Sequence, residues 1–187
     1  MKTEVTYRGL TFEPYITNEQ IEARVAELGR EITRDCADKM PLFICVLNGA
    51  FAFASSLFMN FAGDAEIAFI RLQSYEGTSS TGVVKEVLGL NKSIEGRTVI
   101  IVEDIVDTGN TIHRLITDLS AKHPAEIKVA TLLFKPEALQ LPVKPDYVGF
   151  QIPQKFIIGY GLDLDGLARN LKDIYVVKNE AKNDDAC

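Results

Sequence analysis

Acidic and hydroxyl side chains and a glycine lie close together in the middle of this 187-residue chain. Residues 99–102 are apolar and β-branched, which predicts a strand buried on both faces, and Glu103 and Asp104 follow it. The next polar residues are Asp107, Thr108, Gly109, Asn110 and Thr111. From Ile112 onward, apolar residues recur at helical spacing. The cluster therefore lies between the carboxyl end of a strand and the amino end of a helix.

The residue types in this cluster fit a phosphorylated sugar. A helix amino terminus offers unpaired N–H groups and a positive dipole end, Gly109 lets the backbone approach a ligand, and Thr108 and Thr111 add hydroxyl donors. Ionised Glu103 and Asp104 only accept hydrogen bonds, so they need the hydroxyls of a sugar diol or a magnesium ion. These requirements predict a ribose 5-phosphate. From the residues alone, the alternative is that the acids are ordinary strand-end residues of a doubly wound α/β protein.

Residues 98–111 closely resemble the phosphoribosyl diphosphate signature of type I phosphoribosyltransferases. In that signature an apolar strand precedes two acids, two apolar residues and Asp-Thr-Gly-x-Thr, and residues 103–111 here read Glu-Asp-Ile-Val-Asp-Thr-Gly-Asn-Thr. The resemblance implies an α/β fold with a central, mostly parallel sheet flanked by helices and a small C-terminal hood. It also implies that the two acids bind the ribose and residues 107–111 its 5-phosphate, with Asp107 accepting the purine N7 proton.

The composition predicts one soluble domain. Hydrophobic residues make up 47% of the chain and charged residues 25%, as in ordinary globular proteins. We expect a core over about residues 20–145, a hood formed by about 1–16 and 146–177, and a polar tail over 178–187. No apolar run reaches the roughly 20 residues of a membrane span, and the chain opens without a signal-peptide pattern, so we expect no membrane partner and a cytoplasmic location.

Charge and cysteine content limit the classes of partner. A net charge of −6 argues against a nucleic acid as the main partner, because phosphate-backbone binding needs a basic surface. A small anionic substrate remains compatible with this charge, since local donors and a bound cation decide such a site. The three cysteines, Cys36, Cys45 and Cys187, have neither metal-ligand nor redox spacing, so we expect reduced thiols.

A packing helix is predicted in the first quarter of the chain. Thr17 and Gln20 have the spacing of a capping box, which marks a helix start. Apolar residues at helical spacing follow, and Pro41 ends the pattern.

A second strand and turn offer another cradle of phosphate size. Residues 42–47 predict a buried strand, and Leu47, Asn48 and Gly49 turn the chain into a helix predicted over 51–61. From the residues alone, the turn is either structural or a phosphate site. In type I transferases that use 6-oxopurines, the loop at this position holds the diphosphate and commonly reads Leu-Lys-Gly. The resemblance implies diphosphate binding here, although Asn48, like Asn110, stands where many relatives carry lysine.

A polar loop is predicted between strands at 65–73 and 83–88. Its residues, 74–82, are mostly Ser, Thr and Gly with almost no apolar anchor, which predicts mobility. The loop is either a long hairpin connection or a lid. Ser74 and Tyr75 at its start resemble the lid of hypoxanthine-guanine phosphoribosyltransferases, and a lid would keep water from a reactive sugar cation.

A lysine marks the carboxyl end of a further predicted strand, residues 127–134. Lys135 therefore belongs on the same rim as Asp104 and Asp107, where open α/β sheets bind ligands. From the residues alone, it could equally be a solvated surface lysine. In 6-oxopurine transferases the lysine at this position donates to the 6-oxo group. A 6-amino purine would leave that contact unmade, at a cost of about 1–3 kcal/mol.

A folded hood is predicted over residues 152–163, because proline and glycine interrupt any long regular element there. This segment is the second close match to the 6-oxopurine transferases. The resemblance implies that Phe156 stacks on the base and that the Ile157 backbone meets its Watson–Crick edge, with Asp163 nearby. Without the resemblance, Phe156 reads as a core residue and Asp163 as a turn residue.

The remaining predictions concern the residues that bind the diphosphate and its metal ion. The resemblance implies a Mg²⁺ cofactor held by Asp163, directly or through water, with Glu103 and Asp104 as further candidate ligands. Arg169 would reach the diphosphate, although without the resemblance it reads as a solvated helix charge.

The resemblance runs from about residue 42 to residue 177 and implies a purine salvage enzyme. Its substrates would be a 6-oxopurine and phosphoribosyl diphosphate, and its products IMP (or GMP) and diphosphate. A homodimer or homotetramer is expected.

One alternative is a phosphoribosyl-diphosphate-sensing regulator on the same fold, which would usually carry a DNA-binding domain or a basic RNA-binding face. Another is a phosphotransferase or phosphatase, for which we would expect an Asp-x-Asp nucleophile after a buried strand or a Walker lysine.

Overall fold

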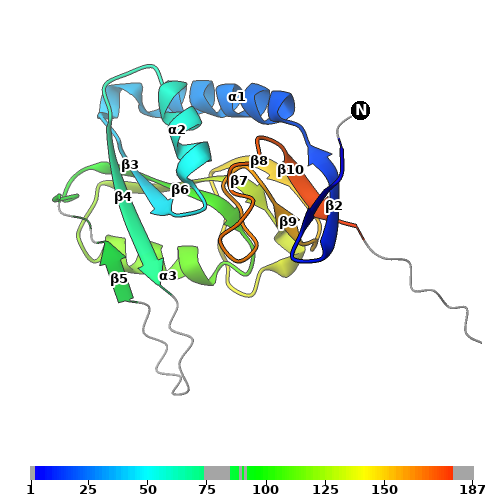
Figure 1. Cartoon of the computed structure of the whole chain (residues 1–187). Coiled ribbons are helices and arrows are strands. Elements are labelled where there is room, and N and C mark those ends of the chain that lie inside the picture. Colours follow the sequence, from blue (N-terminus) through cyan, green and yellow to red (C-terminus); the bar gives the residue numbers. More distant parts are fainter. Residues whose placement is uncertain (1–2, 74–84, 89, 91, 179–187) are drawn as a thin grey trace, which may run out of the picture.

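The computed structural model describes residues 3–73, 85–88, 90 and 92–178. The larger of its two sheets has six strands (Figure 1). Five neighbouring strands run parallel: β4 (Glu66–Gln73), β3 (Leu42–Leu47), β6 (Thr98–Val106), β7 (Glu126–Phe134) and β8 (Tyr147–Gln151). At one edge, β5 (Lys85–Leu88) pairs antiparallel with β4. The predicted central, mostly parallel sheet is confirmed.

Helices cover both faces of this sheet (Figure 1). They are α1 (Asn18–Cys36), α2 (Phe51–Met59) and α3 (Asn110–Ser120). In β6, Ile100 and Val102 pack with α1 and α2, whereas Val99 and Ile101 pack with α3, and all four are fully buried. This strand is therefore buried on both faces, as its sequence predicts. No helix in the described residues is long and apolar enough to cross a membrane.

Helix α1 begins where its sequence predicts. The Thr17 hydroxyl accepts the N–H of Gln20 at 3.3 Å, and the Gln20 side chain accepts the N–H of Thr17 at 2.9 Å, which completes a capping box. Further along the helix, Arg24 donates to the carbonyls of Val148 and Gly149. Because these carbonyls belong to β8, the helix is joined to an edge strand of the sheet.

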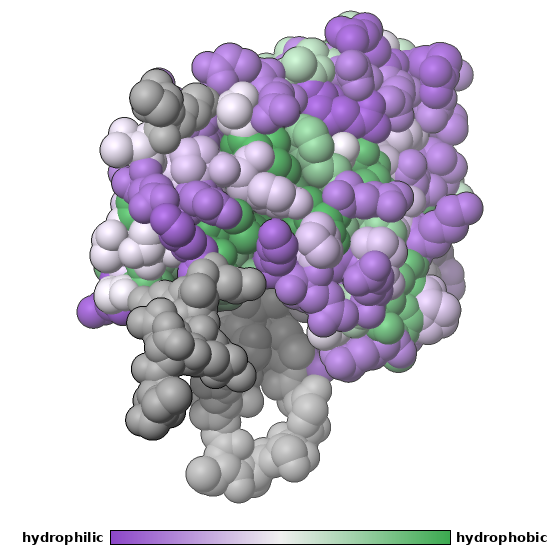
Figure 2. Space-filling model, turned by 90° about the vertical axis from the view of Figure 1, so that its right-hand side faces the viewer, coloured by the Kyte–Doolittle hydropathy of each residue, from purple (hydrophilic) through white to green (hydrophobic). Residues whose placement is uncertain are grey.

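Segments from the two ends of the chain form a second, smaller antiparallel sheet, which is the hood. Its strands, in order across the sheet, are β1 (Val5–Tyr7), β2 (Leu10–Ile16), β10 (Ile174–Val177) and β9 (Ile157–Ile158). The hood has its own small core, and the face in Figure 2 shows hydrophobic residues in the middle with hydrophilic residues around them. β8 lies in the range expected for the hood, but it pairs with β7, so the central sheet extends further along the chain than predicted.

A glycine sets how closely α1 approaches α2. A Cβ at Gly29 would lie 2.6 Å from the Cβ of Asn60, just after α2. Alanine normally stabilises a helix by about 1 kcal/mol relative to glycine. Here the methyl group has no room, so we expect Gly29→Ala to lower the free energy of unfolding by roughly 1–3 kcal/mol in urea denaturation.

The matched control is Ala23→Gly, at an exposed position of the same helix. It should cost about 1 kcal/mol through helix propensity alone. A gain in stability from Gly29→Ala would contradict the close contact between the two helices.

Candidate active site at the carboxyl ends of the strands

The loop between β6 and α3 forms a pocket of about 220 Å³, lined by Glu103 and residues 105–112. Gly109 is the residue that caps α3, and its φ of 83° is a conformation that residues with a side chain rarely adopt. The Asn110 N–H is held by the Thr108 hydroxyl at 3.4 Å. The strand, loop and helix are thus as predicted, and the structure brings Glu103, Asp107 and residues 108–111 around one pocket.

The two neighbouring acids occupy different environments. Glu103 is only 8% exposed, and its Oε2 atom has no hydrogen-bond partner among the described residues. Burial, and then the negative charge of Asp104, raise the pKa of Glu103 well above its usual value. Burial also raises the pKa of Asp104 to about 6, although the Ile105 N–H donates to its Oδ1 at 2.9 Å. A ligand that brings donors or a cation would favour the ionised forms.

The turn after β3, residues 47–49, packs against both Asp104 and the hood. The Leu47–Asn48 peptide bond in this turn is cis. A Cβ at Gly49 would overlap with the Asp104 carboxylate, and a Cβ at Gly161 would overlap with the Gly49 carbonyl. Glycine is therefore required at position 161, where the clash is with backbone and φ is 103°, whereas a side chain at position 49 would have to displace the Asp104 carboxylate.

The lysine predicted at the rim is paired with the candidate base. Lys135 Nζ lies 2.8 Å from Asp107 Oδ2, and the lysine side chain is only 11% exposed. Its backbone N–H donates to the Val106 carbonyl at 3.0 Å, which fixes the end of β7 beside the end of β6. Asp107 therefore touches both the pocket and Lys135. The sequence predicted that the two residues share a rim, but not that they form an ion pair.

The hood contributes an aromatic side chain and a second ion pair. Phe156 is 45% exposed. The centroid of its ring lies 6.1 Å from that of buried Phe12, and the two ring planes are inclined by 48°. Ile157 is fixed by pairing with Val176 in the hood sheet. Phe156 is thus an exposed side chain and not the core residue that its type alone would suggest. Sequence reasoning missed Phe12, because a lone aromatic residue in an N-terminal strand gives no local signal.

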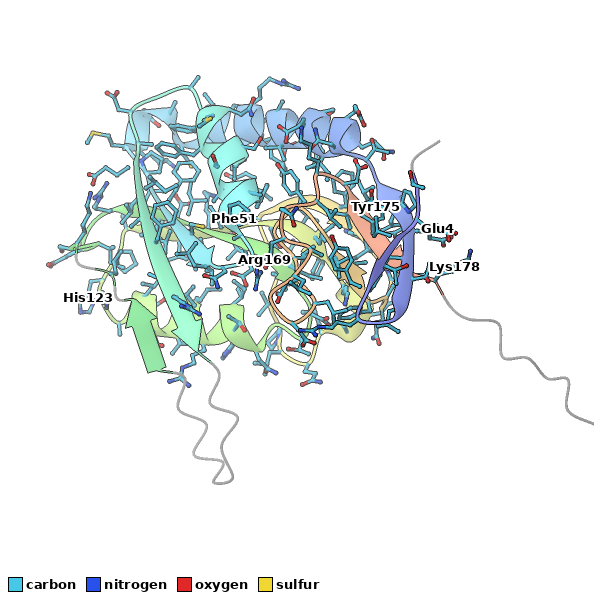
Figure 3. The ribbon with its side chains drawn as sticks, in the orientation of Figure 1. Glu4, Phe51, His123, Arg169, Tyr175 and Lys178 are labelled. Carbon is cyan, nitrogen blue, oxygen red and sulfur yellow. The ribbon has the colours of Figure 1, made fainter. Side chains whose placement is uncertain are left out.

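Arg169 and Asp163 form that ion pair. Their side chains lie 2.7 Å apart, Arg169 also donates to the Gly161 carbonyl at 2.6 Å, and the Gly166 N–H donates to Asp163 at 2.6 Å. Arg169 is therefore not a freely solvated charge; Figure 3 labels it together with Phe51, the first residue of α2, whose ring lies near Gly161. Sequence reasoning missed Gly161, for which the closely spaced hood glycines were the available signal.

The acids of the site fit magnesium only in part. Asp163 and the Glu103 Oε2 atom, which no described residue pairs with, offer the oxygen ligands that Mg²⁺ prefers. However, the described part of the chain holds no cluster of three or more side chains that could bind a metal by itself. Such a donor set fits a Mg²⁺ ion that takes most of its ligands from substrate phosphates and water. The expected lid residues, Ser74 and Tyr75, lie outside the described residues.

A parallel sheet with a pocket between β6 and α3, and a hood at the same rim, is the architecture of the type I phosphoribosyltransferases. Residues 14–165 match the family model of the phosphoribosyl transferase domain, and the chain belongs to this family. It is 40% identical over 168 residues to a hypoxanthine-guanine phosphoribosyltransferase of Streptococcus thermophilus, covering 89% of this chain and 93% of that one. It is 45% identical over 166 residues to the Mycobacterium avium protein of the same name, covering 85% and 82%.

Solved structures agree with this assignment. A hypoxanthine-guanine phosphoribosyltransferase from Bacillus anthracis, 40% identical, has a TM-score of 0.83 and is matched over 89% of this chain and 96% of its own. A hypoxanthine phosphoribosyl transferase from Trypanosoma cruzi, 36% identical, has a TM-score of 0.85 over 93% and 94%. The family resemblance carried by residues 103–111 and 152–163 is confirmed.

The raised pKa of Asp104 makes stability depend on pH. An unfolded Asp titrates near about 3.9, whereas burial raises the folded pKa to about 6. The folded protein holds this proton more tightly, so the contribution of Asp104 to stability is most favourable below about pH 4 and is lost as pH rises to about 6. We expect Asp104→Asn to raise the free energy of unfolding at pH 7.5 by roughly 1–3 kcal/mol, because it keeps the acceptor for Ile105 without burying a charge.

Urea denaturation at several pH values measures this effect, and the gain should shrink as pH falls towards 4. The matched control, Asp64→Asn at an exposed position, should show no such pH-dependent gain. Equal gains for the two variants would contradict a buried, destabilising charge at Asp104.

Proposed function

We propose that this protein is a purine salvage enzyme that joins hypoxanthine or guanine to phosphoribosyl diphosphate, releasing IMP or GMP and diphosphate. The main structural support for this function is the position of Asp107, which lines the β6–α3 pocket and pairs with Lys135. A ribose phosphate in the pocket and a base on Lys135 would meet at this residue, where the new bond forms. Relatives that carry the name hypoxanthine-guanine phosphoribosyltransferase over most of their length support the assignment.

The reaction develops positive charge on the ribose and negative charge on the leaving diphosphate, so each needs groups of opposite character. Glu103 and Asp104 accept hydrogen bonds from the ribose hydroxyls, and these donors lower both raised pKa values so that the acids ionise beside the sugar. Residues 108–111 and the start of α3 hold the 5-phosphate.

The purine is held by donors and acceptors that match an oxopurine. Lys135 donates to the 6-oxo group, Asp107 accepts the N7 proton, and exposed Phe156 stacks on the base. A 6-amino group would place donors against the donors of Lys135. Adenine therefore loses about 1–3 kcal/mol of binding relative to hypoxanthine.

The diphosphate is bound between the 47–49 turn and Arg169. Backbone N–H groups of the turn and the Asn48 amide donate to it, and Arg169 adds a positive charge fixed by Asp163 and the Gly161 carbonyl. Asp163, with Glu103 and Asp104 as further candidates, would hold a Mg²⁺ ion, which would supply positive charge to neutralise the leaving diphosphate. An assembly of two or four copies, which the family resemblance implies, and a cytoplasmic location belong to the same proposal.

Turnover of four purines with phosphoribosyl diphosphate tests this function. We expect hypoxanthine and guanine to react, adenine to react least, and removal of Mg²⁺ with EDTA to abolish nucleotide formation; xanthine completes the comparison. Absorbance changes during nucleotide formation give the rates. Adenine as the best substrate would refute the role of Lys135. Tight binding of phosphoribosyl diphosphate without turnover of any purine would indicate a regulatory protein on this fold.

A substitution at Asp107 separates catalysis from binding. Asp107→Asn keeps the size of the side chain but cannot take a proton, so we expect kcat to fall by about 10²-fold or more. The KM for phosphoribosyl diphosphate should change much less. Steady-state kinetics measure both, with Asp118→Asn on the exposed side of α3 as the control. A raised KM with unchanged kcat would assign Asp107 a binding role only.

A further inference from the structure

Glu22 on α1 connects helix α2 to the hood through two hydrogen bonds. The Tyr160 hydroxyl donates to Oε1 of Glu22 at 2.9 Å, and the Ser56 hydroxyl donates to Oε2 at 2.7 Å. Burial, and then the bond to Glu22, raise the pKa of Tyr160, so its phenol remains a neutral donor. One carboxylate therefore joins three separate parts of the chain.

The hood segment that Glu22 holds is the one that meets the 47–49 turn. Tyr160 has a φ of 49°, and its N–H donates to the Leu171 carbonyl at 2.8 Å. The next residue, Gly161, packs on the Gly49 carbonyl so closely that no side chain would fit. Gly161 also accepts from the Arg169 side chain at 2.6 Å. A displacement of Tyr160 would therefore move Gly161 and Arg169 with it.

We propose that Glu22 is a positioning residue for the diphosphate end of the site, an inference that rests on the proposed function. By fixing Tyr160, it holds Gly161 against the 47–49 turn and keeps the Arg169–Asp163 pair beside that turn. A positively charged group must be held in place to act on a leaving group, and loss of its support weakens binding without removing the group.

The purine end of the hood is held by different contacts. Ile157 pairs with Val176, the Phe156 carbonyl accepts the Val177 N–H at 2.9 Å, and Phe12 supports the Phe156 ring. None of these contacts includes Glu22. Loss of Glu22 should therefore affect phosphoribosyl diphosphate far more than the purine.

Helix α1 retains its place when Glu22 is removed. Its first residue, Asn18, donates its N–H to Asp173 at 2.6 Å, and Arg24 donates to the Val148 and Gly149 carbonyls. These bonds lie on both sides of Glu22 in the helix. A Glu22 variant should therefore fold, with the change confined to its contacts with Tyr160 and Ser56.

The test uses Glu22→Ala and Glu22→Gln, together with Tyr160→Phe. We expect Glu22→Ala to weaken phosphoribosyl diphosphate binding by roughly 3- to 30-fold, both as KM and as Kd from calorimetry, with a change under about twofold in the KM for hypoxanthine. Glutamine can accept from Tyr160 with its oxygen and donate to Ser56 with its amide, so Glu22→Gln should restore most of the affinity.

Two further comparisons isolate the contact. Tyr160→Phe should reproduce part of the loss, and combining it with Glu22→Ala should add little, because both remove one interaction. The matched controls are Ser55→Ala, exposed beside Ser56, and Glu27→Gln, exposed on the same helix. Both controls should leave the two KM values unchanged. Melting temperatures of all variants report folding.

Equal rises in both KM values, or a lower melting temperature with unchanged Kd for phosphoribosyl diphosphate, would show a purely structural role and overturn the proposal. Because calorimetry needs no turnover, the role of Glu22 can be judged even if the wild-type protein converts no purine and the proposed reaction is wrong. A wild-type protein that does not bind phosphoribosyl diphosphate would overturn both.

Discussion

Burial of β6 on both faces decides where polar chemistry can occur in this molecule. Residues 99–102 are all fully buried between α3 on one side and α1 and α2 on the other. An unpaired polar side chain in that stretch would cost several kcal/mol, so polar groups can begin only where the strand emerges. The parallel neighbours β3 and β7 end at the same edge, which brings the 47–49 turn and Lys135 beside Glu103 and Asp107.

The emerging acids are still close enough to the interior to resist ionisation. Burial is the largest contribution to the raised pKa of both Glu103 and Asp104. The free protein therefore carries a local energetic cost that a ligand with hydroxyl donors or a cation would relieve. The free energy that burying these acids costs the free protein is recovered when such a ligand binds, and it therefore adds to the affinity for that ligand. An amide at Asp104 would remove the cost, and with it the ionic acceptor that the proposed ribose contact uses.

Local residue order was enough to predict the centre of the site but not its surroundings. The apolar run, the two acids and Gly109 specify the strand, loop and helix without reference to the rest of the chain, and the Thr17 capping box likewise specifies α1. The hood sheet pairs β2 with β10, which are far apart in the sequence, and such pairing leaves no local signal. For the same reason, the place of β8 beside β7 was not predicted, and neither was the contact between Gly49 and Gly161.

The ion pair between Lys135 and Asp107 explains how a purine could enter without leaving a buried charge alone. The lysine side chain is 11% exposed, so breaking the pair without replacement would leave it poorly solvated. In the proposed complex, an oxopurine offers an acceptor, its 6-oxo group, to Lys135 and a donor, its N7–H, to Asp107. Both residues exchange one partner for another at the same moment. In that complex a 6-amino purine would satisfy only the aspartate, so the pair present in the free protein would itself be the source of discrimination.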